Sequence, residues 1–141
     1  MRKLFLAVII VVVAAFFYRG VSEPLSTGRQ KGDAALALAF EQHAGNVQVE
    51  GEGRVTKLLP DDNSGRRHQR FIVQLASGQT ILIAHNIDLA PRVPSLRVGE
   101  SIAFRGEYEW NPEGGVVHWT HRDPAGRHPA GWLRFGGRSF Q

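Results

Sequence analysis

Three histidines near the end of this sequence are close enough together to do chemistry. His118 and His121 belong to the run His-Trp-Thr-His, and His128 follows seven residues later. Imidazole is the commonest metal ligand in proteins and changes its charge near neutral pH. These residues are therefore candidates for a metal-binding or histidine-assisted site, and the alternative is that they are ordinary core, surface-pair and turn residues. The candidate site residues are His118, Trp119, His121, Asp123, His128 and Glu107, and its candidate metal ligands are His118, His121, Asp123 and His128.

The spacing of these residues limits what they can hold. Two histidines three positions apart point to opposite faces of a strand, so they share a ligand only if the strand ends or bulges between them. Asp123-Pro124 indicates a turn that could bring His121 back. The spacing matches no zinc signature. We therefore expect no cofactor, with a divalent metal such as zinc as the alternative.

A hairpin is expected to position His118. A four-residue loop over residues 111–114 pairs Trp110 with Gly115, and antiparallel pairing then places three further pairs opposite each other: Tyr108 and Val117, Glu107 and His118, and Gly106 and Trp119. This register predicts Trp119 in the core, covering Gly106. It predicts an ion pair between Glu107 and His118 on the other face, which as a surface pair would contribute little stability.

The remaining pattern indicates a mainly β domain. Apolar residues alternate with polar ones most clearly over 101–110, and similar segments occur over 47–59, 70–75, 79–84 and 116–121. About five strands with a glycine-containing first strand predict a small five-stranded barrel of the OB type, with an open sandwich as the alternative. One short helix over residues 33–43, capped by Asp33, is expected before the barrel. His68 and His85 are expected to be solvated or loop histidines.

The first residues indicate a membrane-targeting segment. Arg2 and Lys3 precede an apolar run over residues 4–17. Ala14-Ala15 is a poor cleavage site because bulky aromatic residues follow it. We expect an uncleaved N-terminal membrane helix over 1–20, a linker over 21–32 and one barrel domain over 33–141 outside the cytoplasm. The alternative is a cleaved signal peptide and a periplasmic or secreted domain.

The charge balance of the sequence and its lack of cysteine limit the kinds of partner and site that the protein can have. The net charge of +4 comes from 17 Lys and Arg against 13 Asp and Glu, a modest excess that favours anionic partners. Arg67, Arg70 and Arg105, joined by Arg66, could form a basic ligand-binding face. The absence of cysteine excludes disulfides and thiolate metal sites.

Residues 118–140, HWTHRDPAGRHPAGWLRFGGRSF, carry a resemblance that covers most of the chain after the N-terminal segment. They resemble a bacterial family of uncharacterised small exported proteins marked by an HWTH motif. The resemblance implies no established activity, ligand or cofactor.

Two functional interpretations remain open at this stage, so the sequence does not decide whether the protein is an enzyme. The first is a non-enzymatic module, membrane-anchored or exported, that binds a ligand or protein of the cell envelope. The second is a metal-dependent or histidine-assisted hydrolase, although no nucleophile elbow or HExxH motif is present. Nucleic acid is an unlikely partner because the N-terminal segment directs the domain out of the cytoplasm.

Overall fold

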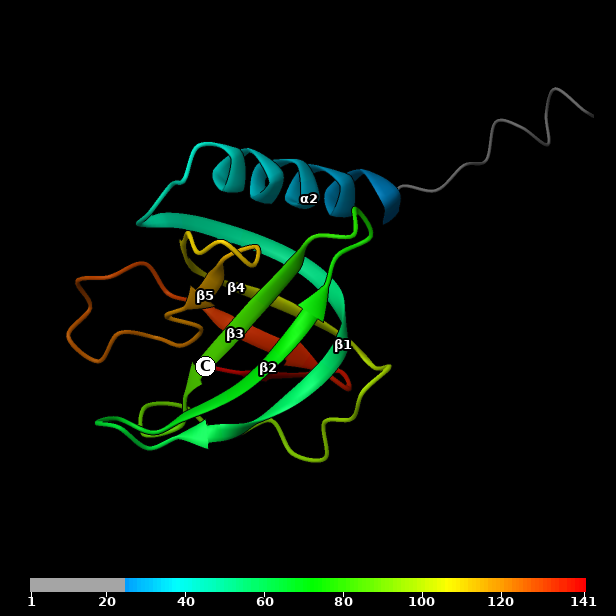
Figure 1. The fold of residues 1–141 in the computed structure, drawn as a ribbon. Helices are drawn as coiled ribbons and strands as arrows, with labels where there is room; N and C mark the ends of the chain where they lie inside the picture. Colours follow the sequence, from blue (N-terminus) through cyan, green and yellow to red (C-terminus); the bar gives the residue numbers. More distant parts are fainter. Residues whose placement is uncertain (1–24) are drawn as a thin grey trace, which may run out of the picture.

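The protein is mainly β, with one helix at the start of the part that the structure describes (Figure 1). This computed structural model describes residues 25–141. The elements are α2 (Leu25–Glu41), β1 (Val47–Asp62), β2 (His68–Gln74), β3 (Thr80–Asn86), β4 (Ser101–Glu109), β5 (Val116–His118), β6 (Trp132–Phe135) and β7 (Arg138–Phe140).

Five of the seven strands form a closed ring. The sheet order is β1-β2-β3-β5-β4-β6-β7, and an additional pairing between β1 and β4 closes β1, β2, β3, β5 and β4 on themselves. The 16-residue β1 makes this possible, because residues 47–54 pair with β4 and residues 54–62 pair with β2. All pairings are antiparallel except β3 with β5. The expected ring of about five strands is therefore confirmed.

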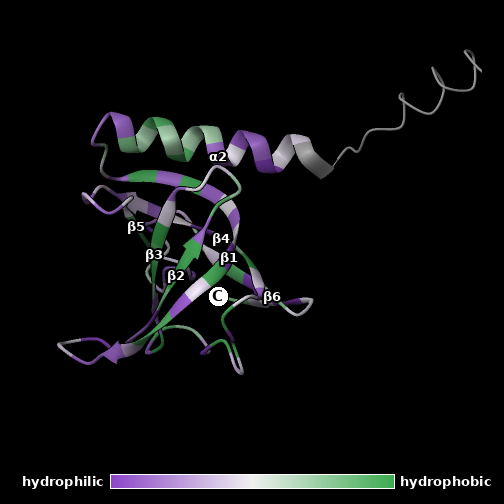
Figure 2. Ribbon diagram, turned by 45° about the vertical axis from the view of Figure 1, so that its right-hand side comes forward, coloured by the Kyte–Doolittle hydropathy of each residue, from purple (hydrophilic) through white to green (hydrophobic). Residues whose placement is uncertain are grey.

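The interior of the ring holds the apolar core. Alternate residues of the strands face inward, as the period of two requires. Figure 2 shows hydrophobic residues along the strands and in the C-terminal half of α2. The fully buried members with large side chains include Leu36, Val55, Phe71, Val73, Ile81, Ile83, Ile102, Phe104, Tyr108 and Leu133.

Helix α2 begins earlier than the sequence predicts. The expected linker over 21–32 is helical from Leu25, and the expected helix over 33–43 ends at Glu41. Asp33 is not the N-cap, since its Oδ2 accepts a hydrogen bond from Ser77 N at 3.1 Å in the β2–β3 turn. A Cβ on Gly32 would lie 2.6 Å from Glu50 O, so this glycine allows close packing of the helix against β1.

The last two strands were not predicted. Strands β6 and β7 form a hairpin around Gly136 and Gly137, both with positive φ, and β6 pairs with β4 on the edge that β5 also uses. A two-residue Gly-Gly loop between apolar segments is a recognisable hairpin signal. Trp132 is buried at the start of β6.

The expected membrane helix over residues 1–20 lies outside the described residues. Within residues 25–141, none of the helices has the length and apolar character needed to span a bilayer.

Candidate functional site

The hairpin between β4 and β5 has the predicted register. Glu107 pairs with His118 and Tyr108 with Val117. Asn111 in the loop accepts hydrogen bonds from Glu113 N and Gly115 N through its side-chain oxygen. The hairpin places Tyr108 and Val117 in the core and leaves Glu107 and His118 on the outer face.

Trp119 does not lie in the core, which corrects the prediction. Its φ of +53° ends the strand, and the ring is only partly buried. Thr120 is buried instead, and its methyl group is one of three atoms, with His118 O and Val117 Cγ1, that a Cβ on Gly106 would contact. The Trp119 ring stacks on His128 with centroids 3.9 Å apart and planes 9° apart, and His121 lies 5.2 Å away.

Asp123 organises the loop that carries His128. Its Oδ1 accepts a hydrogen bond from Ala125 N, and its Oδ2 accepts two more from Arg127 N and His128 N, each at 2.9 Å. These three backbone donors lower the pKa of the carboxyl group below its usual range. The lone pairs that a metal would need are therefore largely engaged by the loop.

His85 forms a buried pair with Thr120. His85 Nε2 lies 2.9 Å from Pro91 O and must donate to it, so Nδ1 accepts from the Thr120 hydroxyl at 2.7 Å. Burial lowers the His85 pKa to about 4. The sequence predicted a solvated or loop histidine here, and that prediction is wrong because both side chains are fully buried.

A cleft of about 610 Å³ lies beside the HWTH segment. It is lined by Arg66, His68, Asn86, Leu89, His118, Trp119, His121, Asp123, Pro124 and Ala125, which we call the histidine cleft. His68 Nδ1 donates to Arg66 O at 2.8 Å, and His121 Nδ1 donates to Arg122 O at 2.6 Å. In the neutral tautomer, Nε2 of each ring is therefore a hydrogen-bond acceptor.

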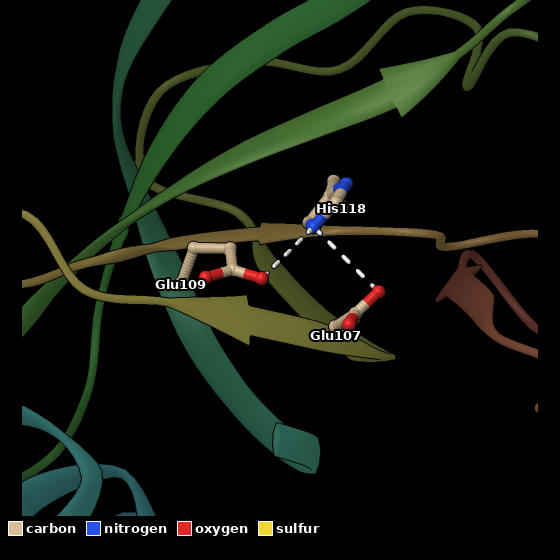
Figure 3. Close-up of side chains that lie close together, drawn as sticks. All are labelled: Glu107, Glu109 and His118. Atoms are coloured by element: carbon tan, nitrogen blue, oxygen red, sulfur yellow. Dashed lines mark ion pairs between the residues drawn. The ribbon is translucent and has the colours of Figure 1, made fainter. Parts of the chain in front are cut away.

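The predicted metal ligands do not converge. Among the described residues, the one group of three metal-binding side chains with ligand atoms within 4.8 Å is Glu107, Glu109 and His118 (Figure 3). His118 Nε2 lies 3.8 Å from Glu107 Oε2 and 4.0 Å from Glu109 Oε1. His128 reaches the same cluster, with Nε2 2.7 Å from Glu107 Oε2. Burial lowers the His118 pKa, against the opposing effect of Glu107.

The sequence analysis did not include Glu109 among the candidate site residues. It also did not predict that His68 lies beside the candidate site. Glu109 is two residues from Glu107 on the same strand, so the period of two could have placed both carboxylates on one face. His68 begins β2, and no local signal in the sequence indicated that it lines the same cleft as His118 and His121.

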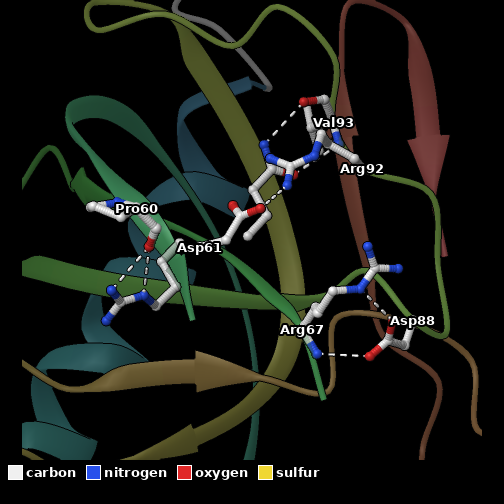
Figure 4. A network of polar contacts seen from close by, with 8 residues as sticks. Pro60, Asp61, Arg67, Asp88, Arg92 and Val93 are labelled. Carbon is white, nitrogen blue, oxygen red and sulfur yellow. Dashed lines mark hydrogen bonds and ion pairs between the residues drawn. The ribbon is translucent and has the colours of Figure 1, made fainter. Parts of the chain in front are cut away.

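The three predicted ligand-binding arginines are not gathered at the histidine cleft, although Arg66 lines it. Figure 4 shows Arg67 held by Asp88, with Nε 2.8 Å from Oδ1. Arg70 donates to Pro60 O through Nε and Nη2, at 3.1 and 3.0 Å. Arg105 lies on β4, which is not adjacent to β2 in the ring.

Comparison with known proteins shows which family the chain matches. The family described as "Protein of unknown function (DUF3465)" matches residues 21–141, which is most of the chain. No curated protein matches the chain.

Proposed function

Since the chain belongs to the DUF3465 family, whose description assigns no function, we propose a function from the site itself. The protein is a non-enzymatic binding module outside the cytoplasm, attached to the membrane by its N-terminal segment or released after cleavage. It binds a small anionic ligand in the histidine cleft. The observation that carries this proposal is a cleft that combines one arginine, three histidines and one tryptophan.

The strand ring supports the position of this site. Its order, with β1 pairing β4 and β3 parallel to β5, fits an OB-like barrel. Such barrels bind ligands on the face of strands 2 and 3 and on the neighbouring loops. The histidine cleft takes Arg66 from the β1–β2 connection, His68 from β2 and Asn86 from β3. This analogy concerns the place of binding and not the ligand.

The charges in the cleft favour an anion. Arg66 is exposed and supplies a full positive charge. Asp123 is the acidic residue of the lining, and its two oxygens already accept three backbone hydrogen bonds. The Nε2 atoms of His68 and His121 add acceptors for ligand hydroxyl groups. A small acid that also bears hydroxyl groups, such as an acidic sugar, has the matching chemistry.

The buried pair of His85 and Thr120 argues against the alternative hydrolase. A histidine within 2.7 Å of a hydroxyl resembles a base and its nucleophile. Here neither side chain has exposed surface, so a substrate cannot reach the hydroxyl. A pKa of about 4 also makes His85 a weak base at neutral pH. The pair therefore has a structural role.

Glucuronic acid and glucose provide the test, because they differ by one carboxylate. We expect glucuronic acid to shift the backbone NMR signals of cleft residues in the full chain, and glucose to shift them far less. Arg66→Glu should weaken glucuronic acid binding by about tenfold or more, equivalent to ~1.4 kcal/mol. Arg97→Glu is the matched control, since Arg97 is exposed and lies outside the cleft lining. Unchanged binding by Arg66→Glu, or equal binding of glucose, contradicts the proposal.

A further inference from the structure

We propose that Glu107, Glu109 and His118 form a binding site for a divalent first-row transition-metal ion on the outer face of the barrel. The site lies between β4 and β5, next to the histidine cleft. It goes beyond the proposed function, which concerns an anionic ligand and Arg66. His118 borders both sites, while Glu107 and Glu109 do not line the cleft.

The backbone register brings the three side chains together. Glu107 and Glu109 are alternate residues of β4, so both point away from the core that contains Tyr108. His118 is the last residue of β5 and pairs directly with Glu107. Opposite residues of an antiparallel pair lie on the same face. The site is therefore held by two paired strands, with none of its three proposed ligands on a loop (Figure 3).

The distances between the three ligand atoms suit a single metal ion if these atoms move slightly closer together. His118 Nε2 is 3.8 Å from Glu107 Oε2 and 4.0 Å from Glu109 Oε1, and all three ligand atoms lie within 4.8 Å of one another. Ligand bonds of roughly 2.0–2.2 Å place neighbouring donor atoms about 3–4 Å apart around one ion. Small movements of the three side chains would close the remaining difference.

The nitrogen of His118 that faces the carboxylates is unsatisfied. Nε2 is buried and has no hydrogen-bond partner among the described residues. Buried polar atoms are nearly always paired, because an unpaired one costs free energy. A metal ion between Nε2 and the two carboxylates would give this atom a partner. The unpaired Nε2 therefore points to a ligand bound between this atom and the two carboxylates.

Neighbouring groups orient the carboxylates. His128 Nε2 lies 2.7 Å from Glu107 Oε2. With its amide nitrogen facing the cluster, the Asn46 side chain donates to Glu107 Oε1 at 2.8 Å and to Glu109 Oε1 at 3.1 Å. Hydrogen bonds of this kind fix the direction of metal-binding carboxylates and increase affinity. The side chain of Glu107 is only 12% exposed, so the site is sheltered on that side.

The donor set selects the class of ion. One imidazole nitrogen and two carboxylate oxygens suit Zn²⁺, Co²⁺ or Mn²⁺. Ca²⁺ and Mg²⁺ prefer an all-oxygen set, so the imidazole disfavours them. A site with three protein ligands leaves a coordination position for water or another small ligand.

Zn²⁺ binding to the full chain, measured by isothermal titration calorimetry in detergent, tests the site. Co²⁺ absorption in the visible range reports the ligand set independently. We expect one equivalent of Zn²⁺ to bind, with Ca²⁺ and Mg²⁺ much weaker. Glu109→Gln and His118→Gln should each reduce the affinity by about tenfold or more and change the Co²⁺ spectrum, because each removes a direct ligand.

Two control variants exclude adventitious binding and misfolding. Glu113→Gln removes an exposed carboxylate in the hairpin loop, and His68→Gln removes a histidine of the cleft. Both should bind Zn²⁺ as the original chain does. Thermal unfolding of the metal-free Glu109→Gln chain should match the original, while Zn²⁺ should raise the melting temperature of the original alone. No saturable Zn²⁺ binding, equal binding by both ligand variants, or an equal loss in the two controls overturns the proposal.

Discussion

Thr120 is the buried residue between Trp119 and His121 of the HWTH segment. Its methyl group lies near Gly106, beside the closer Val117 Cγ1, and its hydroxyl donates to the buried Nδ1 of His85. Trp119 takes a positive φ just before it and leaves the strand to stack on His128. One inward-facing threonine therefore separates the two histidines of the segment. His118 faces the carboxylates, and His121 lines the cleft.

Thr120→Val should destabilise the protein measurably. Valine keeps the shape of threonine but removes the hydroxyl, which leaves His85 Nδ1 buried without a donor. Such an unsatisfied group costs about 1–3 kcal/mol. Thr56→Val is the control, because Thr56 is exposed and its hydroxyl bond to Ile72 O is long at 3.4 Å. Urea unfolding gives both free energies, and an equal effect of the two substitutions would show that the Thr120–His85 bond contributes little.

At the scale of elements, helix α2 contains two glycines in its first half, and only one of them is required by packing. Gly32 lies against Glu50 O, where a side chain has no room, whereas a Cβ on Gly28 would have nothing within 4 Å. Glycine in a helix costs about 1 kcal/mol relative to alanine. The two glycines therefore carry the same local cost, but only Gly32 is required by packing against β1.

Gly28→Ala and Gly32→Ala should change stability in opposite directions. Gly28→Ala should stabilise the fold by about 0.5–1 kcal/mol through helix propensity. Gly32→Ala should destabilise it by about 1–3 kcal/mol, since a methyl group 2.6 Å from Glu50 O forces the helix away from the strand. Chemical denaturation measures both. Stabilisation by Gly32→Ala would mean that the helix moves off β1 at no cost.

These elements show which features could be predicted. The β4–β5 hairpin was predicted in register because its loop length and alternation are local signals. The start of α2 was missed because Gly28 and Gly32 have the composition of a linker, and the reason for Gly32 is a contact with β1. Trp119 was misplaced because a positive φ at a non-glycine residue leaves no trace in the pattern.

At the scale of the whole molecule, ring closure assembles the candidate sites. The parallel pairing of β3 with β5 joins segments more than 30 residues apart, through Leu82 with Val116 and Ile83 with Val117. This closure brings His68 and Asn86 into the same cleft as the HWTH segment. Nothing local in the sequence indicates the pairing of β3 with β5. The cleft could therefore not be predicted, although half of the residues that line it were predicted as candidate site or ligand-binding residues.

The same closure buries His85, which makes the stability of the whole fold depend on pH. The His85 pKa falls from 6.5 to about 4 on folding, mainly because of burial. Between these values the unfolded chain binds the extra proton and the folded chain does not, so stability must fall as the pH decreases from 6.5 to 4. Above pH 6.5 this contribution is fully present. A difference of about 2.5 pKa units corresponds to roughly 3 kcal/mol.

Unfolding by urea at several pH values, together with the NMR titration of the His85 ring, measures this dependence. We expect the free energy of unfolding to decline steadily over that window, and the His85 ring signals to stay constant until the pH nears 4. His118, whose pKa burial also lowers, acts in the same direction. The lowered carboxyl pKa values of Asp62, Asp88 and Asp123 act below the window, because those groups start from 3.8. A His85 ring that titrates near 6.5 in the folded protein would show that water reaches it, and that the Thr120 hydroxyl does not hold it in the neutral form.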